Sequence, residues 1–173
     1  MENSFSFEPV ECISIFIPRV FESQFIKVKT GKNKYILVGN IYRPNSAPYA
    51  NIKYFNQTIS DIFSKIKSDP NLKNVNEVIL AGDMNINLLN HTNHIDTGLY
   101  LDTLLENSFL PLITLPTRIA GSSATLLDHI VTNIADDAYD SGIILSDISD
   151  TFPVFYLRHF KDKSAQVNPV KTF

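Results

Sequence analysis

Hydrophobic and polar positions alternate along the chain with two different periods, which predict strands and helices in a mixed order. Residues 11–17 and 24–29 are rich in Ile, Val and Phe and predict strands, and residues 35–42 form a near-continuous apolar run that predicts a third. Residues 31–33 are turn formers, so the last two runs are expected to form a hairpin. After a loop at 44–48, apolar residues at three-and-four spacing predict an amphipathic helix that ends at the turn signal of residues 69–71; they are Ile52, Phe55, Ile59, Ile62, Phe63 and Ile66.

The second half of the chain continues the same mixture. Residues 78–81 lack polar alternation, which predicts a central strand. A second helix is expected at about residues 97–107, and Pro111 makes the run 109–115 an irregular or edge strand. Further strands are expected at 126–132, 143–145 and 154–157. This order predicts an α+β domain of layered sheets with helices packed on sheet faces.

Length and composition fit one globular domain. With 173 residues, of which 44% are hydrophobic and 19% charged, the chain can bury a sizeable core. We expect residues 1–160 to form the domain and residues 161–173 to be a polar tail. The formal net charge of -3 does not favour a nucleic-acid binder, since such domains are usually basic overall. A lysine cluster at positions 27, 29, 32 and 34 could contact a DNA backbone, but a solvated hairpin face is favoured at about two to one.

Cysteine usage and the absence of long apolar runs indicate the compartment. The single cysteine, Cys12, cannot form an internal disulfide, and the N-terminus lacks the pattern of a signal peptide. No apolar run approaches the roughly 20 residues that cross a bilayer. We therefore expect an intracellular protein, nuclear or cytoplasmic and not secreted, with no membrane partner and no small-molecule cofactor.

The segment 78–87 is the strongest chemical signal, because an apolar strand leads directly into Gly82, Asp83 and Asn85. Phosphodiester hydrolysis needs a metal to neutralise the phosphate, a base for the attacking water and donors for the developing charge. A carboxylate and an amide at one strand end suit that chemistry. Taken alone, the segment has about even odds of being an ordinary turn, since Gly, Asp and Asn favour turns for conformational reasons.

Two other strand ends carry matching polar residues. Tyr42 and Arg43 end the apolar run 35–42, and a phenol and a guanidinium both suit phosphate oxygens; alone, a strand that ends at Pro44 is the simpler interpretation. Asp150 precedes the last strand and alone could belong to a capped loop. Asp128 lies within an apolar strand, where an unpaired carboxylate is costly, so a partner is implied.

Five short motifs occur together in a fixed order. They are Tyr-Arg-Pro at 42–44, Gly-Asp-Met-Asn-Ile-Asn at 82–87, Pro-Thr-Arg at 116–118, Ser-Ala-Thr-Leu-Leu-Asp at 123–128 and Ser-Asp-Thr-Phe-Pro at 149–153. Each motif is weak alone, but the combination is specific. Over about residues 11–160 the chain resembles the endonuclease/exonuclease/phosphatase superfamily, and most closely the endonuclease domains of non-LTR (LINE-type) retrotransposons.

The resemblance implies a DNase I-like fold, a two-layer β-sandwich flanked by helices with its site at one end. It implies a DNA-nicking phosphodiesterase that uses Mg²⁺ or Mn²⁺, acts on DNA and is joined to a reverse transcriptase domain in the parent element. It gives each motif residue a role. Asp83 would activate water, Asn85 would bind the phosphate, Tyr42 would assist there, Asp150 would help at the metal, Asp128 would orient a catalytic histidine, and Arg43, Asn45, Arg118 and Thr125 would bind substrate.

Two departures from the family pattern set further expectations. The histidine that Asp128 should orient is replaced by Thr151, and since acid-base groups contribute about 10²- to 10⁴-fold, this change alone would impair the enzyme. His129 is not expected to substitute, because adjacent strand residues point to opposite faces. The family's metal-binding Glu lies on a strand before the segment that matches residue 11, so we expect a domain that is incomplete at its N-terminus.

Two other functions stay open. A non-catalytic remnant that binds nucleic acid or a protein partner is favoured by Thr151 and by the absent glutamate. A sugar or lipid phosphatase of the same superfamily fits less well, because the Pro-Thr-Arg and Ser-Ala-Thr-Leu context resembles retrotransposon sequences.

Overall fold

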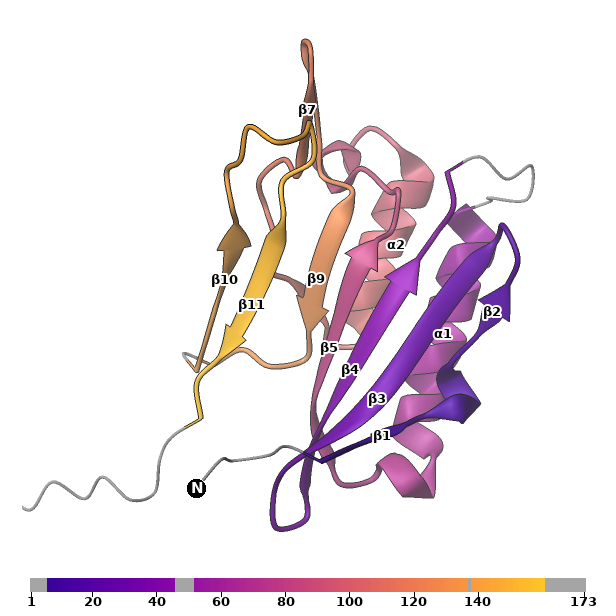
Figure 1. The fold of residues 1–173 in the computed structure, drawn as a ribbon. Helices are drawn as coiled ribbons and strands as arrows, with labels where there is room; N and C mark the ends of the chain where they lie inside the picture. Colours follow the sequence, from indigo (N-terminus) through magenta and orange to yellow (C-terminus); the bar gives the residue numbers. More distant parts are fainter. Residues whose placement is uncertain (1–5, 46–51, 137, 161–173) are drawn as a thin grey trace, which may run out of the picture.

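A computed structural model describes residues 6–45, 52–136 and 138–160 of the chain. One large sheet forms its centre, in the order β1-β3-β4-β5-β9-β6, with β2 paired to β3 (Figure 1). Its only parallel pair among these strands is β4–β5, and helix α1 makes the crossover between them. The strands are β1 (Phe7–Pro9), β2 (Phe16–Ile17), β3 (Phe21–Gly31), β4 (Lys34–Tyr42), β5 (Val75–Asp83), β6 (Leu110–Pro111) and β9 (Asp128–Thr132).

Two helices, α1 (Ile52–Ser68) and α2 (Ile95–Glu106), cover one face of this sheet (Figure 1). Four of the six apolar positions that predicted α1 are buried and the other two are partly buried against the core. The ring of Phe55 lies 5.5 Å from that of Phe21 on β3. At the other end of the helix, Phe63 stacks on Phe109 at 4.2 Å. The helix therefore forms because its apolar stripe matches the apolar face of the sheet.

A second layer lies on the opposite face of the sheet, where β10 (Tyr139–Ile143) and β11 (Val154–Arg158) form an antiparallel ribbon (Figure 1). Alternation along β5 separates the two sides: Leu80 faces the helices with Phe25, whereas Glu77 bonds to Tyr156 of the ribbon. The expected two-layer β-sandwich flanked by helices is thus confirmed. A separate hairpin of β7 (Arg118–Ala120) and β8 (Ser123–Thr125) projects at the upper end of the molecule.

Most expected elements are present, with three corrections. Residues 11–17 are not one strand: a 3₁₀ turn, η1 (Glu11–Ile13), comes first because Ile13 packs into the core and the Ser14 hydroxyl donates to the Val10 carbonyl. The strand expected at 143–145 instead spans Tyr139–Ile143. The β7–β8 hairpin was not expected, since each of its strands is only three residues long and mostly exposed.

Two further 3₁₀ turns complete the described elements. The first, η2 (Pro70–Leu72), is capped by Asp69, and the second, η3 (Leu88–Asn90), by Asn87. No helix in the described residues is long and apolar enough to span a membrane.

Candidate active site

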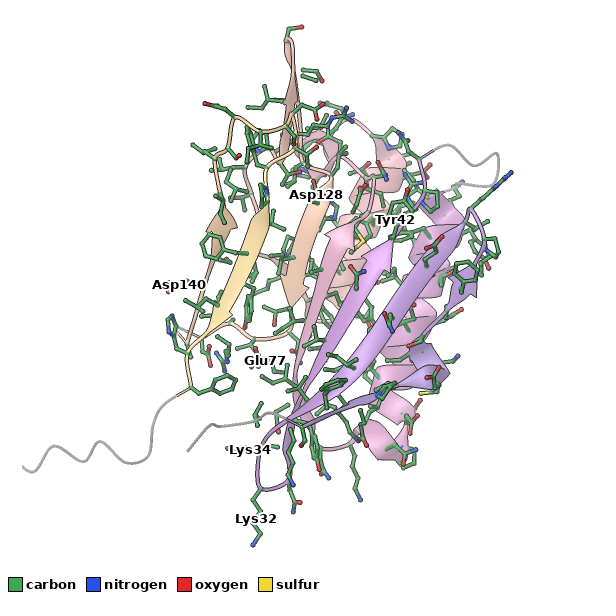
Figure 2. All side chains as sticks on the ribbon, viewed as in Figure 1. Lys32, Lys34, Tyr42, Glu77, Asp128 and Asp140 are labelled. Atoms are coloured by element: carbon green, nitrogen blue, oxygen red, sulfur yellow. The ribbon has the colours of Figure 1, made fainter. Side chains whose placement is uncertain are left out.

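The site lies where β4, β5 and β9 meet at the upper end of the large sheet (Figure 2). The close approach of β4 to β5 requires a glycine at position 82. A Cβ atom there would lie 1.9 Å from the carbonyl oxygen of Ile41, and Gly82 adopts a φ of 146°. The glycine of the Gly-Asp-Met-Asn motif therefore brings Asp83 against the end of β4.

Asp83 and Asp128 lie directly opposite each other in the antiparallel β5–β9 pair. Side chains at opposed positions share a face, and like charges there are destabilising. Burial raises the pKa of Asp83, and the Asp128 carboxylate raises it further. A hydrogen bond from the Asn85 N–H and the charge of Arg43 lower it without cancelling the rise. The residue opposite Asp128 is therefore a second acid, which does not compensate its charge.

Asn85 follows in a left-handed conformation, with φ of 49°. Asn tolerates this region better than most residues because its short polar side chain can bond locally. Its backbone N–H donates to Asp83 Oδ1 at 3.0 Å, and its side-chain Nδ2 donates to the Arg43 carbonyl at 2.8 Å. One of the two amide hydrogens expected to serve a phosphate is thus directed into the protein.

Arg43 has contacts that differ from the expected substrate contact. Only 5% of the residue is exposed, and its Nε and Nη2 donate to the carbonyls of Met84 and Asn85 at 2.8 and 2.7 Å. Burial lowers its pKa, which the charge of Asp83 partly opposes. In this arrangement the guanidinium supports the loop after β5.

Tyr42 ends β4 with 41% of its surface exposed. Because Asn40 pairs with Ala81, Tyr42 comes level with Asp83 and shares its face of the sheet. Figure 2 shows Tyr42 and Asp128 at the same end of the sheet. Asn45 is exposed just beyond this strand end.

Asp150 and Thr151 both contact Arg118 of the Pro-Thr-Arg motif. Arg118 donates to Asp150 Oδ2 through Nε at 3.0 Å and lies within 2.9 Å of it through Nη2, in an exposed ion pair. Thr151 forms an isolated antiparallel bridge with Arg118. The expected metal-site carboxylate is therefore paired with a cation in this structure, and Thr125, expected to bind substrate, lies opposite Arg118 in the β7–β8 pair.

Thr117 joins these parts, and its role was not predicted. It is fully buried, its Oγ1 accepts the N–H groups of Leu127 and Asp128 at 3.1 and 3.2 Å, and its carbonyl accepts the N–H of Phe152 at 2.7 Å. Position 151 is thereby tied to the start of β9. The sequence offers only a weak indication of this role, because Arg118 in the same motif was the more obvious candidate for a functional side chain.

His129 and Asn87 also support the loop after β5. His129 is buried and points towards α2, as strand alternation predicted, with Tyr100 Oη 3.2 Å from Nδ1 and the Ile86 carbonyl 2.9 Å from Nε2. Burial lowers its pKa to about 4, despite bonds to two carbonyls that favour the charged form. Asn87 Oδ1 accepts the N–H of Leu126 at 3.0 Å. These contacts bind the loop to the start of β9.

The described residues do not complete a metal centre. In residues 6–45, 52–136 and 138–160, no three His, Cys, Asp or Glu side chains gather where they could hold a metal ion. Asp83 and Asp128 supply two carboxylates, and Mg²⁺ is held by one or two carboxylates together with substrate phosphates. These two carboxylates suit weak binding of a hard cation.

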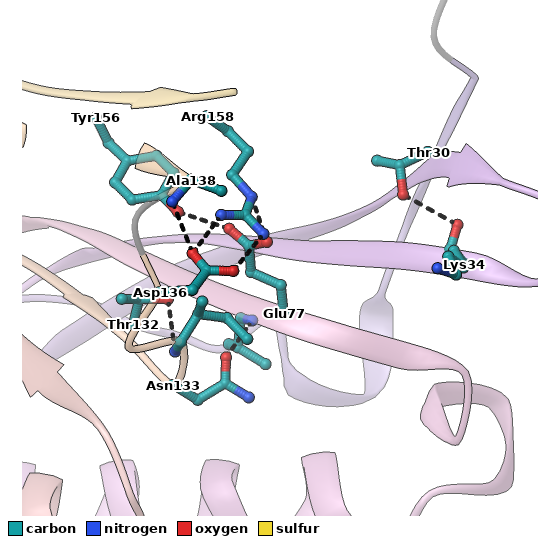
Figure 3. Close-up of polar contacts among 11 residues, drawn as sticks. Thr30, Lys34, Glu77, Thr132, Asn133, Asp136, Ala138, Tyr156 and Arg158 are labelled. Carbon is teal, nitrogen blue, oxygen red and sulfur yellow. Dashed lines mark hydrogen bonds and ion pairs between the residues drawn. The ribbon is translucent and has the colours of Figure 1, made fainter. Parts of the chain in front are cut away.

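The opposite end of the sheet carries a second polar cluster, in which every acid has a cation or a donor (Figure 3). Glu77 is 4% exposed; it accepts Tyr156 Oη at 2.6 Å and lies 2.9 Å from Arg158 Nε. Arg158 also lies 2.8 Å from Asp136. Lys32 and Lys34 belong to this lower end, away from Tyr42 and Asp128, so these two lysines do not extend the candidate site (Figure 2).

Comparisons with known proteins agree with this architecture. No protein-family model and no curated protein sequence matches the chain. Among solved structures, the endonuclease domain of TRAS1, a telomere-specific non-LTR retrotransposon, matches with a TM-score of 0.61 and 16% identity, over 91% of this chain and 69% of that domain. A 3'-5' exonuclease from Neisseria meningitidis matches with a TM-score of 0.53 and 14% identity, over 79% of this chain and 65% of its own.

A double mutant of beta toxin from Staphylococcus aureus, with bound magnesium ions, matches with a TM-score of 0.51 and 14% identity, over 81% of this chain and 58% of the toxin. The chain thus spans somewhat under two thirds of the exonuclease and of the toxin. At these identities the matches establish the fold. The chain has the fold of the endonuclease/exonuclease/phosphatase proteins, and a retrotransposon endonuclease domain is among its structural neighbours.

Proposed function

We propose that this chain is a divalent-metal-dependent phosphodiesterase domain of the DNA-nicking type, derived from a non-LTR retrotransposon and impaired by Thr151. The observation that carries the proposal is the Asp83–Asp128 pair. Two carboxylates directly opposite each other at strand ends cost stability, and such groups are typical of sites kept for chemistry. Asn85 and Tyr42 lie beside them.

The residues divide into chemical roles. Asp83 is the proposed base or orienting group for the attacking water, and its raised pKa fits a proton acceptor nearer neutrality. Asn85 and Tyr42 are proposed to hold the phosphate. A magnesium or manganese ion, when bound at the Asp83–Asp128 end, would neutralise phosphate charge. The TRAS1 domain and the magnesium-bound toxin, which share the fold, support this substrate class and metal.

Thr151 is the proposed cause of the impairment. A histidine at this position would be charged or neutral near physiological pH, whereas a threonine hydroxyl stays neutral and cannot exchange a proton as readily. The bonds of Thr117 support this role: its carbonyl accepts the N–H of Phe152, next to position 151, and its side-chain Oγ1 accepts the N–H of Asp128. We therefore propose that Asp128 corresponds to the carboxylate that orients the histidine, and that Thr151 leaves it with no histidine to orient.

A non-catalytic module that binds nucleic acid or a protein is the second candidate. It is favoured by the Arg118–Asp150 ion pair, which occupies a carboxylate expected at the metal, and by the lack of a three-ligand group in the described part of the chain.

Nicking of supercoiled DNA in millimolar Mn²⁺ separates the two candidates. The unmodified chain is expected to nick no faster than Asp83→Ala. Thr151→His should raise nicking by about tenfold, less than the 10²- to 10⁴-fold of a fully supported acid-base group, because the described residues do not complete a metal site. Thr151→Gln and the double variant Thr151→His/Asp83→Ala should show no gain.

Two results would overturn parts of the proposal. Rapid, Asp83-dependent nicking by the unmodified chain would disprove the impairment. A Thr151→His variant that folds yet nicks no faster than Thr151→Gln would favour the non-catalytic module.

A further inference from the structure

Arg43 is a buried cation beside the candidate site. Its side chain comes from the residue after β4, where Pro44 ends the strand, and only 5% of the residue is exposed. Burying a charge is costly unless it is paired and hydrogen-bonded. A guanidinium placed there to meet substrate would have to be accessible, so its burial indicates a different task.

The described contacts of Arg43 converge on one short segment. Its backbone N–H donates to the Asp83 carbonyl at 3.0 Å, Nε donates to the Met84 carbonyl at 2.8 Å, and Nη2 donates to the Asn85 carbonyl at 2.7 Å. One residue thus binds three successive carbonyls just where β5 ends. In return, Asn85 Nδ2 donates to the Arg43 carbonyl at 2.8 Å.

This set of bonds fixes a conformation that the loop would not favour alone. Asn85 has a φ of 49°, in the left-handed region that L-residues rarely adopt. Such conformations persist where surrounding contacts over-determine them. The same conformation directs the Asn85 N–H to Asp83 Oδ1 at 3.0 Å, so the loop also orients the carboxylate.

We propose that Arg43 is a positioning residue that presets the loop 83–85 and, through Asn85, the orientation of the Asp83 carboxylate. Binding two backbone carbonyls at once requires the planar geometry of a guanidinium. Its planar fork presents donors at fixed angles to two carbonyls, whereas a lysine ammonium is a single point charge on a flexible stem. The consequence for phosphate chemistry rests on the proposed function, but the control of loop conformation does not.

Amide hydrogen exchange and NMR of the full chain test the proposal. Arg43→Lys keeps the charge, Arg43→Met removes it, and Arg158→Lys is the matched control, since it changes a guanidinium at the other end of the sheet. In both Arg43 variants, exchange at the Asn85 backbone N–H should rise at least tenfold relative to exchange at Leu80 within β5. The resonance of the Asn85 side-chain amide and the coupling that reports its φ should change as well.

Arg158→Lys should leave these Asn85 signals unchanged. The proposal is overturned if Arg43→Lys retains the native Asn85 coupling and exchange, which would show that charge alone suffices. It is also overturned if exchange rises equally at Leu80 and Asn85, which would make Arg43 a general stabilising residue. Arg43→Lys remains informative if Arg43→Met does not fold.

The outcome is independent of nicking. Altered loop signals with no Asp83-dependent reaction in any variant would support the positioning role and count against the proposed function. If the Arg43 variants leave the loop signals unchanged while the Thr151→His variant nicks DNA, the proposed function would be supported and the positioning role of Arg43 would be contradicted.

Discussion

The two ends of the large sheet differ in the groups that lie next to their acidic side chains. At the lower end, Glu77 is buried but meets the Tyr156 hydroxyl and the Arg158 guanidinium, which join β5 to β11. At the upper end of the same strand, Asp83 lies directly opposite Asp128. The first arrangement compensates a buried charge and holds two layers together. The second places two like charges opposite each other, which lowers stability. Such an arrangement is typical of functional sites, where ionisable groups are placed for a reaction and not for stability.

The paired end should be the more sensitive to loss of one partner. Arg158→Met leaves Glu77 buried without its cation, and breaking such a pair typically costs about 3 to 5 kcal/mol. We expect a loss near the lower value, since the Arg158 side chain is 19% exposed, measured as the free energy of unfolding in urea. Adding Glu77→Gln, which removes the stranded charge, should recover part of that loss.

The matched control is Arg118→Met, which removes the cation of an exposed ion pair at the site end. Exposed pairs contribute about 0 to 1 kcal/mol, so this change should be nearly neutral. Equal losses in Arg118→Met and Arg158→Met would contradict the contrast between the two ends.

His129 should make the site end sensitive to acid. Its pKa is lowered to about 4 by burial, from an ordinary value near 6.5. The unfolded chain therefore takes up the proton first, so this stabilisation is fully present above pH 6.5 and is lost as the pH falls from 6.5 to 4. The loss amounts to roughly 3 kcal/mol, at 1.36 kcal/mol per pKa unit.

Unfolding free energies measured between pH 7 and 4 check this expectation. His129→Gln should remove most of the slope in that interval, although it also lowers stability at neutral pH. His91→Gln, in an exposed position, should keep the slope. An unchanged slope in His129→Gln would assign the acid sensitivity to other groups.

The smallest expected effect is a gain at the site end. Asp128→Asn removes the charge opposite Asp83 and should stabilise the chain at pH 7 by about 0.2 to 1 kcal/mol, the range for cross-strand pairs. It should also lower the pKa of Asp83, because Asp128 contributes to its rise. The gain should shrink as the pH falls, because the raised pKa of Asp83 makes this carboxylate lose its charge sooner than an ordinary Asp. Asp140→Asn, which removes a partner of His159, should bring no such gain.

Local patterns in the sequence predicted much of the fold. The stripe of Phe55, Ile59 and Ile62 placed α1, and the apolar run before Asp83 placed β5, because both signals depend on periods of a few residues. The strand-end motifs also predicted that Asp83, Asn85, Asp128 and Asp150 would converge at one end of the sheet. The structure places Asp83 opposite Asp128 and bonds it to Asn85, whereas it pairs Asp150 with Arg118. Residues 11–17 were assigned wrongly, because a short apolar run fits a strand and a 3₁₀ turn equally well.

The supporting contacts could not be predicted in the same way. The described hydrogen bonds of the Arg43 and Thr117 side chains are to backbone groups, and the position of a backbone group in the fold cannot be read from the sequence. Arg43 at a strand end therefore looked like a substrate residue. The pairing of Glu77 with Arg158 likewise depends on how β11 lies across the sheet, which no local period specifies.

Localising a bound divalent cation tests the central claim most directly, namely that the end with opposed acids is the site and the end with paired acids is structural. Mn²⁺ broadens NMR signals of nuclei near it, so titration of the full chain shows which end binds. We predict broadening at Asp83, Asn85 and Asp128 at millimolar Mn²⁺, lost in Asp83→Asn/Asp128→Asn, with the signals of Glu77 and Asp136 unaffected, because Mg²⁺-type ions depend on each of few carboxylates. Broadening centred on Glu77 and Asp136, or none near Asp83, would contradict the account.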